Sequence, residues 1–189
     1  KVLMDKLSQK SFQTRAVHAG ERVPPADFRP VATPIWNTVG YLYESMDDLD
    51  AVFERKKPGQ VYLRYSNPTT EAFENAVANL ENAEAAQAYS SGMAAIHAAL
   101  LGAGVKAGTS IVAALDVYGA TFTLLNSLFT NMGVNVRMVD VSDHDEVETA
   151  LKETGATVLF VESISNPLLK VADVPSLARL ARQHHASLL

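Results

Sequence analysis

The stretch Thr109-Ser-Ile-Val-Ala-Ala-Leu-Asp-Val-Tyr-Gly-Ala-Thr121 decides the fold class of this 189-residue chain. It begins with an apolar segment of strand length, 109–115, and continues through a short turn into a helical pattern. From about Glu84 onward, short apolar segments alternate in the same way with longer amphipathic ones. This alternation is typical of parallel strands joined by crossover helices, and it predicts an α/β fold with a mostly parallel sheet flanked by helices.

The other predicted elements extend this alternation along the chain. Further strands are expected at 86–90, 134–139, 157–161 and 186–189, and helices at 92–105, 121–132, 143–152 and from 173 to about 185. Asp143 and Asp173 stand at the starts of the last two helices, where a carboxylate caps the backbone amides well.

Residues 1–60 differ from the rest and are predicted to form an extended arm. Prolines interrupt the segment, and only 46–55 has a firm helical pattern. Its apolar and aromatic side chains would be costly to leave in water, so the arm is expected to pack on another surface, for which a partner subunit is one candidate. The residues concerned are the prolines Pro24, Pro25, Pro30 and Pro34, and the side chains of Phe28, Ile35, Trp36, Tyr41 and Tyr43. Residues 61–189 are then the first part of a large α/β domain.

The composition narrows the classes of function. With 48% hydrophobic and 20% charged residues, the chain can form one sizeable core. A net charge of -5 without a lysine or arginine cluster argues against nucleic acid or an anionic membrane as partner, so a small-molecule ligand is expected. No apolar run has the length of a membrane span, and the polar N-terminal segment lacks a secretory signal, which favours the cytoplasm. The absence of cysteine excludes disulfides, thiolate zinc sites and cysteine nucleophiles, and no metal site is predicted.

A candidate phosphate site lies in Ala88-Tyr-Ser-Ser-Gly-Met-Ala-Ala-Ile96. A predicted strand, a Ser-Ser-Gly turn and a helix start follow one another directly there. The first amides of a helix have no intrahelical acceptor and carry a partial positive charge, and glycine allows an anion to approach closely. The alternative is that Ser91 caps the helix and no ligand binds.

The segment Tyr62-Leu-Arg-Tyr-Ser-Asn-Pro-Thr69 is predicted to be extended because Pro58-Gly59 and Asn67-Pro68 bracket it. Extended residues two apart share a face, so Tyr62 and Arg64 would present a hydroxyl beside a guanidinium suited to phosphate oxygens. The alternative is a solvated edge with an ordinary surface arginine. Thr69 or Thr70 is expected to cap the helix that follows.

Two further motifs directly follow predicted strands, where α/β folds build their ligand crevices. In Asp116-Val-Tyr-Gly-Ala-Thr121, Tyr118 is placed to lie flat on an aromatic ligand, or else to pack on a helix end with its hydroxyl satisfied. In Glu162-Ser-Ile-Ser-Asn-Pro167, Asn166 is placed to offer an amide N–H to a phenolate oxygen, or else to form an Asn-Pro turn without a ligand.

In this order, Tyr-x-Arg-x-x-Asn-Pro-Thr, Ser-Gly-Met, Tyr-Gly-x-Thr and Glu-Ser-x-Ser-Asn-Pro resemble the trans-sulfuration family of pyridoxal 5'-phosphate enzymes. That family includes cystathionine γ-synthase, cystathionine γ- and β-lyases, methionine γ-lyase and O-acetylhomoserine sulfhydrylase. The resemblance extends from Thr14-Arg-Ala-Val-His-Ala-Gly20 to Asn166-Pro-Leu-Leu-Lys-Val-Ala-Asp173. It implies a fold-type I enzyme of methionine and cysteine metabolism, a lyase or transferase that catalyses elimination or γ-replacement on sulfur amino acids or O-acyl-homoserine.

The resemblance also implies a role for each motif. Ser91, Gly92 and Met93 would hold the cofactor phosphate, chiefly through the main-chain amides of Gly92 and Met93. Tyr118 would stack on the pyridine ring and assist catalytically when the cofactor passes from its lysine to the substrate amine. Asn166 would lie near the ring's phenolic oxygen, with Glu162 as a supporting residue. Tyr62 and Arg64 would reach the phosphate of a neighbouring subunit, which implies a homo-oligomer, a dimer of dimers, with shared active sites.

The family's Asp-Asn-Thr-Phe segment and its Schiff-base lysine would be expected beyond Leu189, so this stretch is expected to be the N-terminal half of a longer enzyme and inactive by itself. Lys106, Lys152 and Lys170 match no catalytic position of the family. Two alternatives stay open, namely a phosphate- or nucleotide-binding module without catalysis and another fold-type I enzyme such as an aminotransferase. Within the family, Ala120 disfavours methionine γ-lyase, where a cysteine is usual at that position.

Overall fold

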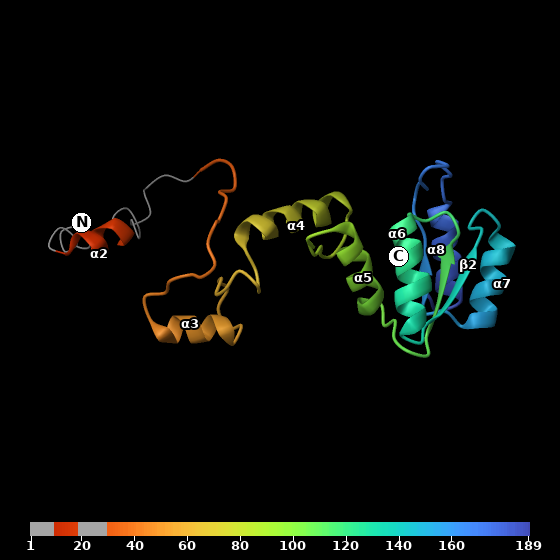
Figure 1. The fold of residues 1–189 in the computed structure, drawn as a ribbon, viewed down its shortest axis with the longest axis horizontal. Helices are drawn as coiled ribbons and strands as arrows, with labels where there is room; N and C mark the ends of the chain where they lie inside the picture. Colours follow the sequence, from red (N-terminus) through yellow and green to blue (C-terminus); the bar gives the residue numbers. More distant parts are fainter. Residues whose placement is uncertain (1–9, 19–29) are drawn as a thin grey trace. The chain divides into compact units, whose positions relative to one another are not determined.

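The computed structural model describes residues 10–18 and 30–189, and the chain divides into two compact units after Ala86 (Figure 1). Of the residues predicted for the arm, Pro24, Pro25 and Phe28 lie outside the described residues. The boundary of the arm at residue 60 stays a prediction.

The first unit contains the helices α2 (Phe12–His18), α3 (Met46–Phe53) and α4 (Pro68–Leu80). Ser45 caps α3, because its hydroxyl accepts a hydrogen bond of 3.1 Å from the amide of Asp48. The helix predicted at 46–55 is confirmed, and it ends at Phe53, before Arg55 turns into the left-handed region with a φ of 58°.

Polar contacts connect the start of α4 to the preceding segment. Asn67 is buried and caps the helix by accepting from the amide of Thr69 at 2.9 Å, while its own amide group donates to the carbonyl of Trp36 at 2.9 Å. The prediction that Thr69 or Thr70 caps α4 is therefore wrong. The Thr69 hydroxyl instead accepts from the amide of Trp36 and donates to the carbonyl of Pro34. It therefore stabilises the segment at residues 34–36 and not the start of the helix.

The second unit alternates helices and strands as the sequence predicts. Its elements are α5 (Gly92–Gly102), β1 (Ser110–Ala114), α6 (Gly119–Thr123), η1 (Leu124–Phe129), β2 (Asn135–Val139), α7 (His144–Thr154), β3 (Val158–Phe160), α8 (Val174–Gln183) and β4 (Ser187–Leu188). Asp143 and Asp173 cap α7 and α8 through their carboxylates, as predicted. The acidic caps satisfy first-turn amides that would otherwise have no partner.

The strands form one parallel sheet in the order β2-β1-β3-β4. Strand β1 pairs with β2, with Ser110 opposite Asn135, and with β3, with Ile111 opposite Val158. After β1 the chain moves outward to β2, and after crossing back it continues from β3 to β4 on the other side. The order therefore reverses between β1 and β3, and α/β folds bind ligands outside the carboxyl ends of the strands at such a point.

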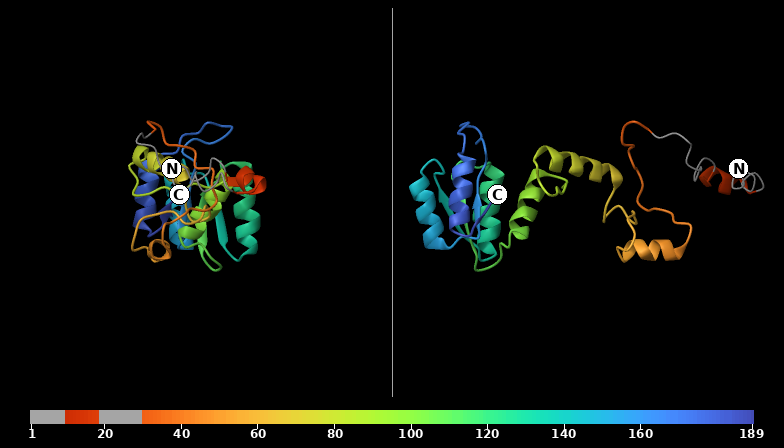
Figure 2. Two further views of the ribbon diagram at one scale, coloured as in Figure 1. Left: turned by 90° about the vertical axis from the view of Figure 1, so that its left-hand side faces the viewer. Right: turned by 180° about the vertical axis from the view of Figure 1, so that it is seen from behind.

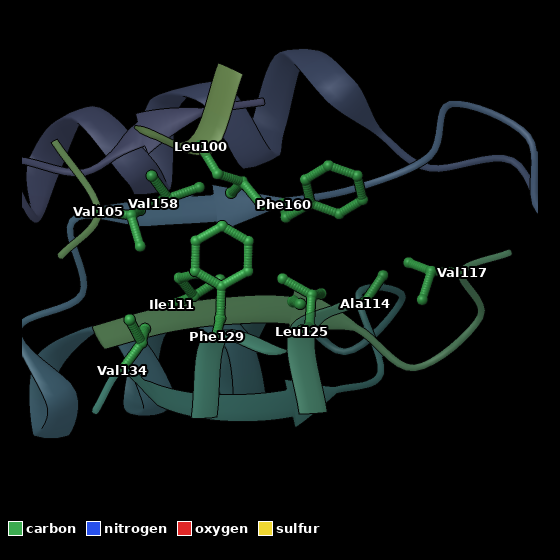
Figure 3. Close-up of a cluster of buried hydrophobic side chains, with 11 residues drawn as sticks. Leu100, Val105, Ile111, Ala114, Val117, Leu125, Phe129, Val134, Val158 and Phe160 are labelled. Carbon is green, nitrogen blue, oxygen red and sulfur yellow. The ribbon is translucent and has the colours of Figure 1, made fainter. Parts of the chain in front are cut away.

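Two apolar layers enclose the sheet. On one face, Ile111 of β1 and Val158 of β3 pack with Leu125 and Phe129 of η1 and Leu100 of α5 (Figure 3). On the other face, α7 and α8 cover the strands (Figure 2). Val147 and Leu151 of α7 and Leu177 of α8 pack there with Val112 of β1 and Leu159 of β3. Neighbouring strand residues thus point to opposite layers, as the two-residue period of a strand requires.

Two sequence expectations differ from the structure of this unit. The sheet of the described residues does not include 86–90, and this Ala-Gln-Ala-Tyr-Ser segment has few of the β-branched residues that favour a strand. The helix predicted at 121–132 begins at Gly119 and has π geometry from Leu124 to Phe129. Apolar spacing could not reveal this, because the α pattern also places Leu125 and Phe129 on one face. Among the described residues, no helix is both long enough and apolar enough to cross a bilayer.

Candidate functional site

The start of α5 is open to an anion. Ser91 caps the helix by accepting from the amide of Ala94 at 3.2 Å. The amides of Gly92 and Met93 stand before it in the first turn, where an amide has no intrahelical acceptor. Ser91 and Gly92 are exposed, and a Cβ built on Gly92 would meet nothing within 4 Å. The capping role of Ser91 and a phosphate role for the next two amides are therefore compatible.

The charge at the start of α5 also differs from that of the other capped helices. Helices α3, α4 and α7 carry aspartate or glutamate in their first turn, and α8 is capped by the carboxylate of Asp173. Helix α5 has no acidic residue in its first turn and takes its cap from a neutral serine. Because a nearby carboxylate would repel a phosphate, this helix start is the best suited of these five to an anionic ligand.

The loop between β1 and α6 presents Tyr118. Its side chain is 55% exposed, and its backbone forms the N-terminal boundary of α6. A Cβ at the following Gly119 would meet nothing within 4 Å, so the space beside this turn is open. Tyr118 is thus accessible to solvent, and its stacking role stays a prediction.

Two contacts bring the predicted motifs of this unit together at the carboxyl end of β1. The Thr121 hydroxyl lies 3.9 Å from the sulfur of Met93, which joins the start of α6 to the start of α5. The backbone amide of Tyr118 donates to Oε1 of Glu162 at 2.8 Å, which joins this loop to the one after β3. The phosphate turn, the tyrosine and the glutamate accordingly meet at the reversal point of the sheet.

The loop after β3 holds Asn166 at the surface. Its neighbour Ser165 is buried, with its amide donating to the carbonyl of Lys170 at 2.9 Å and its hydroxyl accepting from the amide of Lys170 at 3.2 Å. Asn166 itself is exposed, and the bond that follows it, to Pro167, is cis. The loop is therefore organised from within and leaves the asparagine side chain accessible.

Tyr62 and Arg64 lie in the first unit and contact each other. Tyr62 forms an isolated antiparallel bridge with Gly40, and the chain then turns, with the amide of Tyr65 donating to the carbonyl of Tyr62 at 2.9 Å. The prediction of an extended path is therefore wrong at Leu63–Tyr65. The guanidinium carbon of Arg64 instead lies 5.2 Å from the centre of the Tyr62 ring, a cation–π arrangement.

The ion pair of Asp116 and Lys170 was not predicted from the sequence. Nζ of Lys170 lies 2.6 Å from Oδ2 of Asp116, and this hydrogen bond is the main cause that raises the pKa of the lysine above its ordinary value. The two residues are far apart in the chain, and no periodic pattern links them. The signal that was available is their position, since each lies in a loop that follows one of two adjacent strands.

Comparison with known proteins identifies the family. Residues 13–189 match the family described as Cys/Met metabolism PLP-dependent enzyme. The chain belongs to this family. It is 35% identical to an L-methionine gamma-lyase of Fusobacterium nucleatum over 97% of this chain and 45% of that protein, and 36% identical to an O-succinylhomoserine sulfhydrylase of Pseudomonas aeruginosa over 96% and 44%.

Solved structures agree with the membership of the Cys/Met metabolism family. The structure of metB from Corynebacterium glutamicum superimposes with a TM-score of 0.76 at 33% identity, covering 96% of this chain and 45% of that one. A Campylobacter jejuni protein described as an O-acetylhomoserine (thiol)-lyase has a TM-score of 0.76 at 30% identity, over 85% and 39%, and contains N'-pyridoxyl-lysine-5'-monophosphate. The fold-type I architecture is thereby confirmed, and the chain spans less than half the length of these relatives.

The residues present fit the phosphate end of the family's cofactor, pyridoxal 5'-phosphate. The start of α5 offers exposed amides, a glycine with open space beside it and no acidic group in its first turn. The exposed Tyr118 is the N-cap residue of α6, and α6 contacts this helix through Thr121 and Met93. A donor set of amides beside an accessible aromatic ring matches a ligand that is a phosphate on a flat ring.

Proposed function

We propose that the protein catalyses elimination or γ-replacement on sulfur amino acids or O-acyl-homoserine with pyridoxal 5'-phosphate as cofactor. The observation that carries this proposal is the meeting of Ser91–Met93, Tyr118 and Glu162 at the carboxyl ends of the two central strands. Membership of the Cys/Met metabolism family supports the reaction class. When bound, the cofactor supplies an electron sink for the α-carbon of an amino acid.

Each candidate residue of the site then has a role in binding or proton transfer. The amides of Gly92 and Met93 bind the phosphate, and the absence of an acidic neighbour leaves their positive field intact. The Tyr118 ring orients the cofactor by stacking, and its hydroxyl accepts and returns a proton near the substrate amine. Glu162 holds the main chain of Tyr118, and the Asn166 amide donates to an oxygen on the ring.

Tyr62 and Arg64 serve the phosphate of a neighbouring subunit in this proposal. Their cation–π contact keeps the Arg64 guanidinium near the Tyr62 ring, and a guanidinium and a tyrosine hydroxyl are both hydrogen-bond donors that suit phosphate oxygens. The protein would accordingly be a homo-oligomer, a dimer of dimers with shared sites. A cytoplasmic location stays a prediction from the sequence.

The phosphate assignment is tested in the whole protein by titration with pyridoxal 5'-phosphate, followed by visible absorbance. Gly92→Asp puts a carboxylate at the start of α5 and is expected to weaken cofactor binding about 10- to 100-fold, because charge-assisted hydrogen bonds are lost and repulsion is added. Gly102→Asp adds the same charge at the other end of the same helix, where a Cβ is also unhindered, and is the matched control. Equal affinities in the two variants would contradict the assignment.

The shared site is tested by mixing two defective subunits. Arg64→Ala and Gly92→Asp are each expected to weaken cofactor binding, but a mixed oligomer would contain one site that carries neither change. Recovery of part of the turnover on cystathionine, or on O-acetylhomoserine with sulfide, is the expected result. If both changes belonged to the site of a single chain, mixing would restore nothing.

A further inference from the structure

Two side-chain contacts join the loop after β1 to the loop after β3. One is the hydrogen bond of 2.8 Å from the amide of Tyr118 to Glu162, and the other is the ion pair of 2.6 Å between Lys170 and Asp116. The first contact lies at the start of the later loop and the second near its end. The loop that carries Asn166 is therefore fastened at both ends to the loop that carries Tyr118.

Hydrogen bonds within the loop after β3 connect Lys170, which the ion pair holds, to the residue before Asn166. Its two limbs bond to each other through the bridge between Ile164 and Val171 and through the amide of Ala172, which donates to the carbonyl of Ser163 at 3.1 Å. The main chain of Lys170 exchanges two further bonds with Ser165, the residue before Asn166. Ser165 is buried and bonded to Lys170, so a lysine that is held at Asp116 also holds the main chain just before Asn166 in place.

The ion pair also argues against a nucleophilic role for Lys170. Its ammonium is engaged by the carboxylate, and the hydrogen bond to Asp116 raises the pKa of the lysine, so the amine stays protonated. A protonated amine is no nucleophile. Lys170 instead acts by connecting its own loop, the one after β3, to the loop after β1 that carries Asp116.

We propose that Asp116 and Lys170 are positioning residues that set the ring-stacking Tyr118 and the ring-contacting Asn166 at a fixed separation. This inference rests on the proposed function for the roles of Tyr118 and Asn166. The clamp itself is a property of the two loops, and it exists whether or not a cofactor binds. The ligand class it serves is a planar aromatic ring with an oxygen substituent, contacted on its face by one loop and at its edge by the other.

The test compares variants of the whole protein in two measurements. The first is hydrogen exchange of the Tyr118 amide without added cofactor, and the second is affinity for pyridoxal 5'-phosphate. Lys170→Met is expected to speed exchange of this amide and to weaken affinity, each by about two- to fivefold, as for a partly exposed ion pair. Lys170→Arg keeps the charge and is expected to restore both values, while Asp116→Asn repeats the defect from the other side of the pair.

Arg137→Met is the matched control. It removes another exposed ion pair of the same unit, in which NH1 of Arg137 lies 2.5 Å from Glu153 and joins β2 to α7. We expect it to leave the Tyr118 amide and cofactor affinity unchanged. A Tyr118 amide that exchanges as in the unchanged protein in both Lys170→Met and Asp116→Asn would overturn the clamp. If the variants speed exchange of the Tyr118 amide but the unchanged protein binds no pyridoxal 5'-phosphate, the clamp is supported and the proposed function is refuted.

Discussion

The two units stabilise their folds by different means. Among the described residues of the first unit, only Val52 is a buried apolar side chain, and large apolar residues such as Ile35, Leu42 and Phe73 are exposed. The other buried apolar residues in the described part of the chain lie in the second unit, in the two layers that enclose the sheet. In the first unit the well-defined contacts are polar, as in the bonds of Asn67 and Thr69 to the segment before Tyr41.

This difference teaches where each unit is vulnerable. Burial of apolar area is the dominant stabilising contribution in a core, whereas a hydrogen bond contributes about 0.5–1.5 kcal/mol net. The second unit should therefore respond most to the loss of volume inside its layers. The first should respond most to the loss of a polar group at a helix start.

The largest expected effect is that of Phe129→Ala in the second unit. Phe129 is fully buried between η1 and the sheet, so its removal leaves a cavity and should lower the free energy of unfolding by about 3–5 kcal/mol. Urea unfolding measures this change. Phe73→Ala, which removes the same side chain from an exposed position of α4, should change the value by less than about 0.5 kcal/mol. Equal losses in the two variants would refute the contrast between the units.

An intermediate effect is expected from Asn67→Ala in the first unit. The substitution removes the cap of α4 and leaves the carbonyl of Trp36 without its donor, which should cost about 1–2 kcal/mol. Hydrogen exchange of the amides of α4 reports the loss. Asn67→Asp keeps the capping oxygen and loses the donor, so exchange in this variant should be intermediate between Asn67→Ala and the unchanged protein. Thr70→Ala should exchange like the unchanged protein. A Thr70→Ala variant as damaged as Asn67→Ala would restore the threonine cap that the sequence predicted.

The smallest effect is a pH dependence at the start of α8. The hydroxyl and then the amide of Ser176 donate to Asp173 and hold the pKa of its carboxyl below the ordinary value. A lowered pKa means that this stabilisation is present above about pH 4, the ordinary range of aspartate, and is lost as the pH falls through the folded-state value. Protection of the Ser176 amide should therefore decline in acid, after correction for the intrinsic exchange rate. Asp173→Asn keeps a capping oxygen without a titrating group, and an acid decline that survives in it would contradict this origin.

Much of the second unit could be predicted because its pattern is local. Apolar runs such as 109–115 and capping residues such as Asp143 determine where elements begin and end, and the structure places β1 and α7 accordingly. The first unit was harder to predict. Asn67 rather than a threonine caps α4 because of a bond to the distant Trp36, and the turn after Tyr62 accompanies its bridge to Gly40. Such long-range pairings leave no periodic trace in a sequence.

Some residues of the candidate site could likewise be predicted from local pattern, and others could not. Ser91, Tyr118 and Glu162 were identifiable because each stands directly at a strand end or a helix start, and the structure joins the loops that carry Tyr118 and Glu162. The roles assigned to these residues stay predictions. The pair of Asp116 and Lys170 depends on β1 lying beside β3, an order that alternation along the chain does not specify.

The same strand order has a consequence for biosynthesis. Strand β1 is complete at Ala114, its edge toward β2 is covered by Asn135–Val139, and its other edge must wait for Val158–Phe160. At ribosomal rates of about 5–20 residues per second, that edge stays open for roughly 2–9 s. During this time Ile111, Val112 and their neighbours form a short apolar strand without its partner, the kind of segment that aggregates most readily. On the ribosome, β1 is thus the strand of this unit whose edge waits longest for a partner with which it pairs in the finished sheet.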